Sequence, residues 1–136
     1  LGTTNFTETT YFPACDIPVT ITGSGITTGN HIFFAGDTTL DNMTLTLSVA
    51  STTTYISSEG HDLTIGENVV GSNTGKERFC LTTCYGAGSN GDATLTVKAG
   101  HWRNIFVAGY KSGNTGNATL TQEQMKEMSV VFNLPK

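Results

Sequence analysis

The feature that most constrains the fold of this chain is a unit made of an alternating strand, a corner of small residues and a second short strand. Its clearest copy spans residues 92–109, DATLTVKAGHWRNIFVAG. In residues 94–97 the alternation places Leu95 and Val97 on one face and two threonines on the other, which is typical of a half-buried β-strand. The second strand follows the corner and ends at Gly109.

This unit recurs along the chain. Residues 31–36 (HIFFAG) match residues 104–109 (NIFVAG) in pattern. The glycines that close successive units are 21–28 residues apart, at Gly36, Gly60, Gly88 and Gly109. That distance is the length of one turn of a β-solenoid or of one β-arch in a stack. We therefore predict an all-β fold, a short β-solenoid or stacked β-arch with open edges, with a β-sandwich as the alternative.

The composition agrees with an all-β fold. The 136 residues include 25 Thr, which suit strands because they are β-branched, and 16 Gly, which suit corners. Only 13% of the residues are charged, and the net charge is −4. The Lys and Arg residues are scattered from Lys76 to Lys136, so we predict no binding to the phosphates of nucleic acid. No apolar run approaches the roughly 20 residues that cross a membrane, so we predict no membrane insertion.

The length indicates a single all-β domain that spans residues 1–136. Residues 1–16 are polar and rich in Thr, and we interpret them as an extended N-terminal arm. Residues 122–136 form a C-terminal tail, in which residues 122–128 (QEQMKEM) are helix-like and residues 129–134 return to strand character. Because the chain starts at Leu1, we expect either a mature product without its signal peptide or a cut piece.

The candidates for disulfides are the three cysteines, Cys15, Cys80 and Cys84. Outside the cell an odd count leaves one thiol for a partner chain, or unpaired. Four residues of straight strand separate two Cα atoms by about 13 Å, whereas a disulfide needs less than about 7 Å. Cys80 therefore pairs with Cys84 only across a turn at residues 82–83, and otherwise Cys15 takes one of them. A zinc site that adds His61 or His101 is the alternative, but its spacing fits no known finger.

Three sequons would permit N-glycosylation in a secreted protein, at Asn5, Asn42 and Asn117. A Thr-rich chain that contains Asn also produces such triplets by chance. The sequence alone leaves these two interpretations open, and the three residues are glycosylation candidates.

The chain carries no recognised catalytic motif. The nucleophile elbow Gly-x-Ser-x-Gly does not occur, and residues 71–76 (GSNTGK) are too short for a phosphate-binding loop. Four acidic residues could bind calcium or provide a glycosidase pair, namely Asp37, Asp41, Asp62 and Glu67. Asp residues in turns more often bond to the backbone. We predict that the protein is not an enzyme and has no cofactor and no resident metal.

Four aromatic residues could form a stacking surface for sugars, namely Tyr55, Tyr85, Trp102 and Tyr110. Trp102 lies at a corner between His101 and Arg103, where a Trp is more exposed than in a strand. The alternative, which we favour, is that Trp102 caps a solenoid edge or fills an interface. Trp102 and Tyr110 are the candidate aromatics for contact with a glycan or with another copy.

At residues 39–45 (TLDNMTL), 60–66 (GHDLTIG) and 91–109 the chain resembles the Thr/Gly-rich β-solenoid repeats of adhesin-like surface proteins from anaerobic bacteria and methanogenic archaea. This resemblance covers residues 37–121 and implies a β-solenoid at the cell surface. In overall character the short, Thr-rich, Cys-containing chain also resembles the subunit of an archaeal cell sheath. Such a subunit stacks β-arches in an amyloid-like way and is locked by disulfides.

These observations predict an extracellular structural protein whose partners are copies of itself, assembled edge to edge into a sheath, filament or surface layer locked by disulfides. The strands between residues 19 and 65 contain no Lys or Arg, and uncharged strands pair readily with copies of themselves. Open head-to-tail contacts build filaments or tubes. The alternative is a carbohydrate-binding or adhesin module of a larger surface protein, with glycans as partners.

Overall fold

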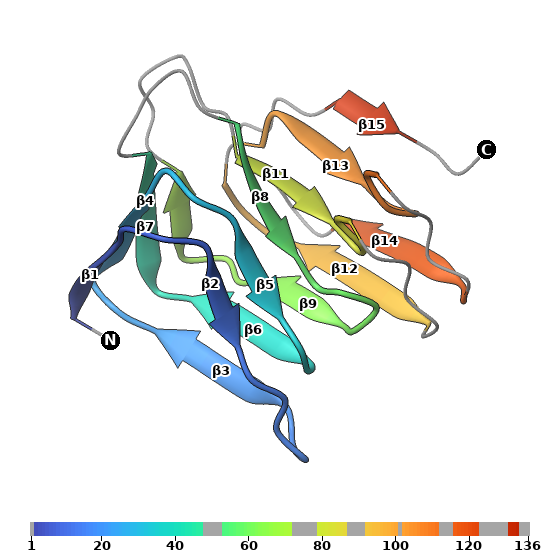
Figure 1. Cartoon of the computed structure of the whole chain (residues 1–136), viewed down its shortest axis with the longest axis horizontal. Helices are drawn as coiled ribbons and strands as arrows, with labels where there is room; N and C mark the ends of the chain where they lie inside the picture. The colour runs from blue at the N-terminus through green and yellow to red at the C-terminus, as the bar shows by residue number, and fades with distance from the viewer. Residues whose placement is uncertain are drawn as a thin grey trace.

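A computed structural model describes residues 2–47, 53–71, 79–86, 92–100, 102–111, 116–122 and 131–133. These residues form a β-solenoid of about four turns and contain no helix. The chain passes through three sheets in a repeating order, so that successive turns add strands to the same sheets (Figure 1). All pairings between the described strands are parallel. The predicted β-solenoid is therefore confirmed, and the β-sandwich alternative is wrong.

The three sheets are named A, B and C in the order in which the chain enters them. Sheet A contains β1 (Thr3–Phe6), β4 (Gly25–Thr28), β7 (Met43–Leu47) and β10 (Val69–Gly71). Sheet B contains β2 (Thr10–Phe12), β5 (Ile32–Phe34), β8 (Thr54–Ser57), β11 (Phe79–Thr82), β13 (Asn104–Phe106) and β15 (Val131–Asn133). Sheet C contains β3 (Val19–Thr22), β6 (Thr38–Asp41), β9 (Leu63–Ile65), β12 (Ala93–Val97) and β14 (Ala118–Gln122). We call one passage through the three sheets a rung.

The core consists of ladders of apolar side chains that occupy the same inward position on successive rungs. In sheet B the strand register aligns four fully buried residues, Ile32, Ile56, Leu81 and Ile105. In sheet C it aligns Leu63 with Leu95 and Leu40 with Ile65. Each buried Leu or Ile contributes about 1.5–3 kcal/mol relative to an exposed one, so a one-residue slip of register would be costly. The sequence alternation that predicted strands is the pattern that builds these ladders.

Residues 37–42, which contain two Asp and one Asn, predict a turn from their sequence, and the structure differs from this prediction. Most of the stretch is the strand β6, because Leu40 is buried between the rungs before and after it. That burial outweighs the turn preference of the Asp and Asn residues. The bend is confined to the end of the stretch, where Asn42 has a φ of 52°. Gly66 lies at the corresponding corner of the next rung, beside Asp41. A Cβ on Gly66 would collide with the Asp41 side chain, so this position requires glycine.

The two ends of the stack leave apolar side chains partly covered. Residues 3–12, expected as an arm, form β1 and β2, which pair with β4 and β5. Within the described part of the chain, β1, β2 and β3 each have a paired neighbour on one side. The inward side chains of this first rung, Phe6, Phe12 and Ile21, are only partly buried against the core. At the other end, Ala118 and Leu120 of β14 are also only partly buried against the core.

The C-terminal tail is described only in part. Gln122 ends β14, and the rest of the predicted helix-like patch, residues 123–128, lies outside the described residues. The predicted terminal strand is confirmed as β15, which pairs with β13. Among the described residues, no helix is long and apolar enough to span a membrane.

Candidate functional site

The outer face of sheet B is the surface on which aromatic side chains gather. Because alternate residues of a strand face opposite sides, the neighbours of the inward Ile and Leu residues point outward. In sheet B these outward positions include Tyr11, Phe33, Tyr55 and Phe106. In sheet C the outward positions flanking the same kind of apolar ladder are mostly threonines. Among the described residues, sheet B, in contrast to sheet C, therefore combines a core-facing ladder with an aromatic outer face.

Two loops add further rings to this face. Tyr85 follows β11 and Tyr110 follows β13, and the two loops run side by side through backbone hydrogen bonds from Tyr110 N to Cys84 O (2.8 Å) and from Lys111 N to Tyr85 O (2.9 Å). The Tyr110 ring stacks on Tyr55 with 4.3 Å between the ring centroids, and the Tyr85 ring lies 5.0 Å from Tyr55. The loops thus cover Tyr55, which is 8% exposed.

The rings form a continuous band along the stack. Tyr11 and Phe33 are stacked with their centroids 5.1 Å apart, and Phe33 lies 5.5 Å from Tyr85. The ring of Phe106 contacts that of Tyr110, with 4.9 Å between the ring centroids, and adds the last ring to the band. We call Tyr11, Phe33, Tyr55, Tyr85, Phe106 and Tyr110 the aromatic band. Its two ends are open to solvent, since Tyr11 is 72% exposed and Tyr110 is 40% exposed.

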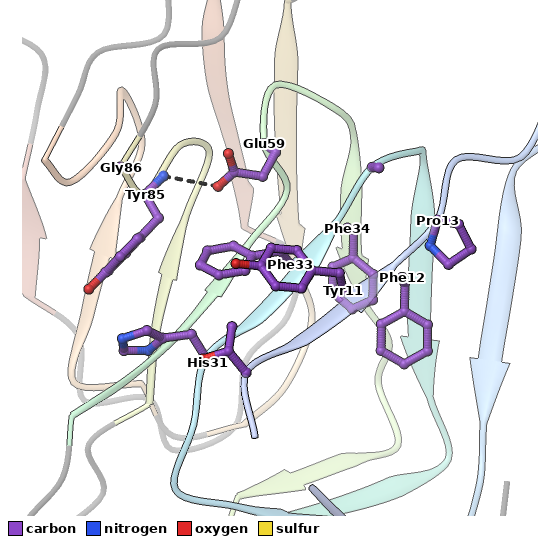
Figure 2. Close-up of a pocket in the computed structure, with 11 residues that line it drawn as sticks. Tyr11, Phe12, Pro13, His31, Phe33, Phe34, Glu59, Tyr85 and Gly86 are labelled. Carbon is purple, nitrogen blue, oxygen red and sulfur yellow. Dashed lines mark hydrogen bonds between the residues drawn. The ribbon is translucent and has the colours of Figure 1, made fainter. Parts of the chain in front are cut away.

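A groove of about 610 Å³ runs along the N-terminal half of the band. Its size falls within the roughly 300–1,000 Å³ that small-molecule sites occupy. Figure 2 shows the Tyr11 and Phe33 rings in the middle of the groove, with Tyr85 on one side and Phe12 and Phe34 on the other. The lining residues that carry titratable polar groups are Tyr11, His31, Glu59 and Tyr85. The groove crosses several rungs, because Tyr11 belongs to the first and Tyr85 follows the strand of the fourth.

Glu59 provides the carboxylate of the groove and is held in a fixed position. Its Oε1 accepts hydrogen bonds from Ser57 Oγ (2.5 Å) and from the backbone N–H of Tyr85 (3.1 Å) (Figure 2). Its backbone adopts a φ of 47°, in the left-handed region that non-glycine residues rarely occupy. The neighbouring Gly60 N donates to Thr83 O (2.7 Å) and fixes this turn to the next rung.

His31 lies beside Tyr85 with 4.7 Å between the ring centroids. The backbone N–H of Tyr55 donates to His31 Nδ1 (3.1 Å), so Nδ1 is unprotonated and the neutral ring carries its proton on Nε2. Burial lowers the pKa of His31, and the positive charge of Lys111 lowers it further. His31 is therefore a neutral hydrogen-bond donor at neutral pH.

Two further groups beneath the loops are held in their neutral forms. Burial raises the pKa of Tyr55, and a hydrogen bond with Tyr110 adds to this effect. Burial also raises the pKa of the Cys80 thiol, which pairs in register with Tyr55 on the neighbouring strand. The middle of the outer face is thus an uncharged layer at neutral pH.

The aromatic residues predicted from the sequence are brought together in part. Tyr55, Tyr85 and Tyr110 lie in one cluster, which agrees with the stacking surface that the sequence left open beside the favoured alternative. The expectation that Trp102 is exposed is wrong, because Trp102 is 2% exposed, packs edge-on against Phe79 and donates from Nε1 to Ala99 O (3.0 Å). Its corner folds inward because the large indole ring fills the core while its N–H finds a backbone acceptor.

The predicted cysteine pairings are not found. None of the three cysteines forms a disulfide, and Cys80 and Cys84 are fully buried whereas Cys15 is exposed. The turn at residues 82–83 does exist, since Thr82 Oγ1 accepts from Cys84 N (3.2 Å) and donates to Cys84 O (2.8 Å). This turn does not join the two thiols. Of the three cysteines, Cys15 is the one that offers its surface to another chain.

Three of the four acidic residues that could have bound calcium, Asp37, Asp41 and Asp62, act as caps for the backbone. At the corner between sheets B and C, Asp37 Oδ1 accepts from Asp62 N (2.9 Å), and Asp62 Oδ1 accepts from Thr94 N (2.9 Å). Further along, Asp92 Oδ1 accepts from Asn117 N (2.7 Å). We call these three aspartates the aspartate ladder. Asp41 plays the same part at the corner between sheets C and A.

No metal site is formed by the described residues, in which no group of three or more His, Cys, Asp or Glu side chains converges. His61, a candidate zinc ligand, instead lies 4.0 Å from Asp37. His101, the other candidate, lies outside the described residues. The alternative of a zinc site with Cys80 and Cys84 therefore has no support in the described part of the chain.

The three sequon asparagines are all exposed. Asn5 lies in β1, Asn42 at the bend before β7, and Asn117 just before β14. Each is accessible to a glycosylating enzyme, and their glycosylation stays a prediction.

Sequence reasoning missed Tyr11, His31, Phe33 and Glu59 as members of one site. A signal was present, because aligning residues 31–36 with residues 104–109 places Phe33 at the position of Phe106. The signal for Glu59 is weaker, since its role depends on a backbone contact with Tyr85, 26 residues away. Comparisons of the chain with protein-family models, with curated proteins and with solved structures found no match.

Proposed function

We propose that this chain is an extracellular structural protein whose copies assemble edge to edge, along the axis of the solenoid, into a sheath, filament or surface layer. The observation that carries the proposal is the first rung. It presents three uncharged strands whose outer edges have no partner among the described residues. The same rung leaves Phe6, Phe12 and Ile21 partly uncovered, so a second copy placed there would extend both the sheets and the core.

The hydrogen-bonding groups of the first rung point in the direction that such assembly needs. Val19 N donates to Asp37 O (3.0 Å), so Val19 bonds to β6. In a parallel sheet the backbone N–H and C=O groups of successive residues point toward the neighbouring strands on opposite sides. The N–H of Thr20 therefore points toward the open side of β3. The same argument applies to β2, where Thr10 N donates to His31 O (3.0 Å) and the N–H of Tyr11 points outward.

The strands of the first rung also lack the usual protection of an edge strand, and the two Pro residues of this rung, Pro13 and Pro18, lie just outside β2 and β3. Natural sheets block their edges with Lys, with Pro or with bulges. Here β1, β2 and β3 contain no charged residue and no Pro. If disulfides lock the assembly, the exposed Cys15, in the loop between β2 and β3, is the cysteine that would form them.

The substitution Thr20→Pro tests the proposal. It removes an N–H that the monomer does not use between its own strands, and Pro is tolerated at such an edge position. Thr20 is also exposed, so its side chain is not needed in the core. We expect wild-type protein to form large particles in sedimentation velocity and ordered objects in negative-stain images, and Thr20→Pro to remain small with an unchanged far-ultraviolet circular dichroism spectrum.

Thr20→Val is the matched control, because it keeps the N–H and removes only the hydroxyl group. It should assemble like the wild type. Assembly of Thr20→Pro to the same extent as Thr20→Val, or a wild-type protein that stays monomeric at high concentration under oxidising conditions, would contradict the proposal.

A further inference from the structure

We propose that the groove on the outer face of sheet B is a binding site for a neutral saccharide chain. The site is formed by Tyr11, His31, Phe33, Glu59 and Tyr85. All five residues belong to one chain, and Tyr11 lies in the first rung, which is also the contact surface of the assembly proposed above (Figure 2).

The walls of the groove suit a pyranose ring. One face of such a ring carries C–H groups and is apolar, and it packs on the electron-rich face of an aromatic ring. Tyr11 offers such a face, since Phe33 covers one side of its ring and the side chain is 72% exposed. Tyr85 also lines the groove, and its ring is in tilted contact with Phe33, with 5.5 Å between the centroids, so the two rings form a continuous aromatic surface.

The polar groups of the groove suit hydroxyl groups. Glu59 supplies a carboxylate, whose Oε1 is already fixed by Ser57 and by the backbone of Tyr85. His31 supplies a neutral N–H, because its Nδ1 is occupied by the N–H of Tyr55. A fixed acceptor, a fixed donor and aromatic walls are the combination that orients a ligand with both hydroxyl and C–H surfaces.

Charge selects against ionic ligands. Among the described residues that line the groove, Glu59 is the acidic one and there is no Lys or Arg, so an anionic sugar or a phosphate would be repelled by the Glu59 carboxylate, with Lys111 beside Tyr85 offsetting part of this repulsion. A cation would compete with Lys111, whose Nζ already lies 5.0 Å from the centre of the Tyr85 ring. A neutral saccharide meets neither obstacle.

The length of the groove favours a chain of sugars over a single one. From β2 to β11 the groove spans three strand spacings, which is about 14 Å. The strained backbone of Glu59 is a second, independent sign of function, because left-handed non-glycine residues persist where a side chain must be held in place. The site also differs from the one expected around Trp102, which is buried.

Saturation-transfer difference NMR of the wild-type protein with neutral hexasaccharides tests the site. The probes are hexamers of glucose, of N-acetylglucosamine, of mannose and of galactose, each at about 10 mM, which detects a Kd of about 1 mM and below. We expect saturation of the C–H protons of at least one probe and none for a galacturonate hexamer. Tyr11→Ala should weaken the binding by about tenfold, the loss expected for one stacking ring.

Ile17→Ala is the matched control, because Ile17 is 71% exposed, as Tyr11 is, but does not line the groove. It should leave binding unchanged. The proposal is overturned if no neutral probe is saturated, if the galacturonate hexamer binds as well as the neutral ones, or if Tyr11→Ala and Ile17→Ala behave alike. Because assembly would place a second copy beside Tyr11, the wild type and both variants are also measured in the Thr20→Pro background, so that a site covered by assembly is distinguished from a site that does not bind.

Discussion

The aspartate ladder predicts that Asp62→Ala destabilises the solenoid by a definite amount. Asp62 Oδ1 accepts the N–H of Thr94 at 2.9 Å and so joins the third rung to the fourth. The side chain is exposed, so water replaces part of the lost bond and the expected cost is about 1 kcal/mol. With an unfolding entropy of about 2.1 cal/mol/K per residue, this cost lowers the Tm of a 136-residue chain by about 3–4 °C.

Thermal unfolding followed by circular dichroism measures this shift. Asp62→Asn is the control, because its side-chain carbonyl accepts the same hydrogen bond without the charge. We expect its Tm to stay within about 1 °C of the wild type, since an amide acceptor replaces a carboxylate at an exposed site. Equal losses for Ala and Asn would show that the charge and not the bond matters, and an unchanged Tm for Asp62→Ala would refute the ladder as a stabilising element.

Two further predictions concern pH and thiol access. Since the pKa of His31 is lower in the folded chain than the usual value of 6.5, the unfolded chain binds the extra proton first, and stability should fall as the pH drops below 6.5. Chemical denaturation at several pH values measures this, and His31→Asn should lose less stability on acidification than the wild type; an equal loss would contradict the assignment. Iodoacetamide should label Cys15 in the native protein and reach Cys80 and Cys84 only after unfolding, as mass spectrometry can show. Rapid native labelling of all three would contradict their burial.

Much of the fold could be predicted from the sequence, because solenoid strands alternate strictly. The alternation in residues 94–97 places Leu95 and Val97 on one face of a strand, and the structure buries that face in the core. The strand β6 was missed because Asp and Asn residues surround its one buried Leu. Its pairing with two neighbouring rungs is tertiary information that no local pattern contains.

The candidate site was harder to predict, because its residues come from four rungs. Tyr55, Tyr85 and Tyr110 do lie together, but the sequence grouped them because they are aromatic and not because of their positions on neighbouring strands. Trp102 lies at a corner outside the strands, where no alternation indicates which way a side chain points, and the structure buries it. Asp37, Asp41 and Asp62 do bond to the backbone, as expected, but their partners lie on the next rung, 25 to 32 residues away, which local turn chemistry does not predict.

The central claim is that copies of this chain continue one another along the solenoid axis. Electron diffraction or high-resolution imaging of the native assemblies, prepared without and then with reductant, tests it most directly. We expect ordered assemblies in which the spacing of about 4.8 Å between successive strands continues across the contacts between copies. A protein that is a monomer in both conditions, or assemblies in which this spacing is interrupted at every contact between copies, would contradict it.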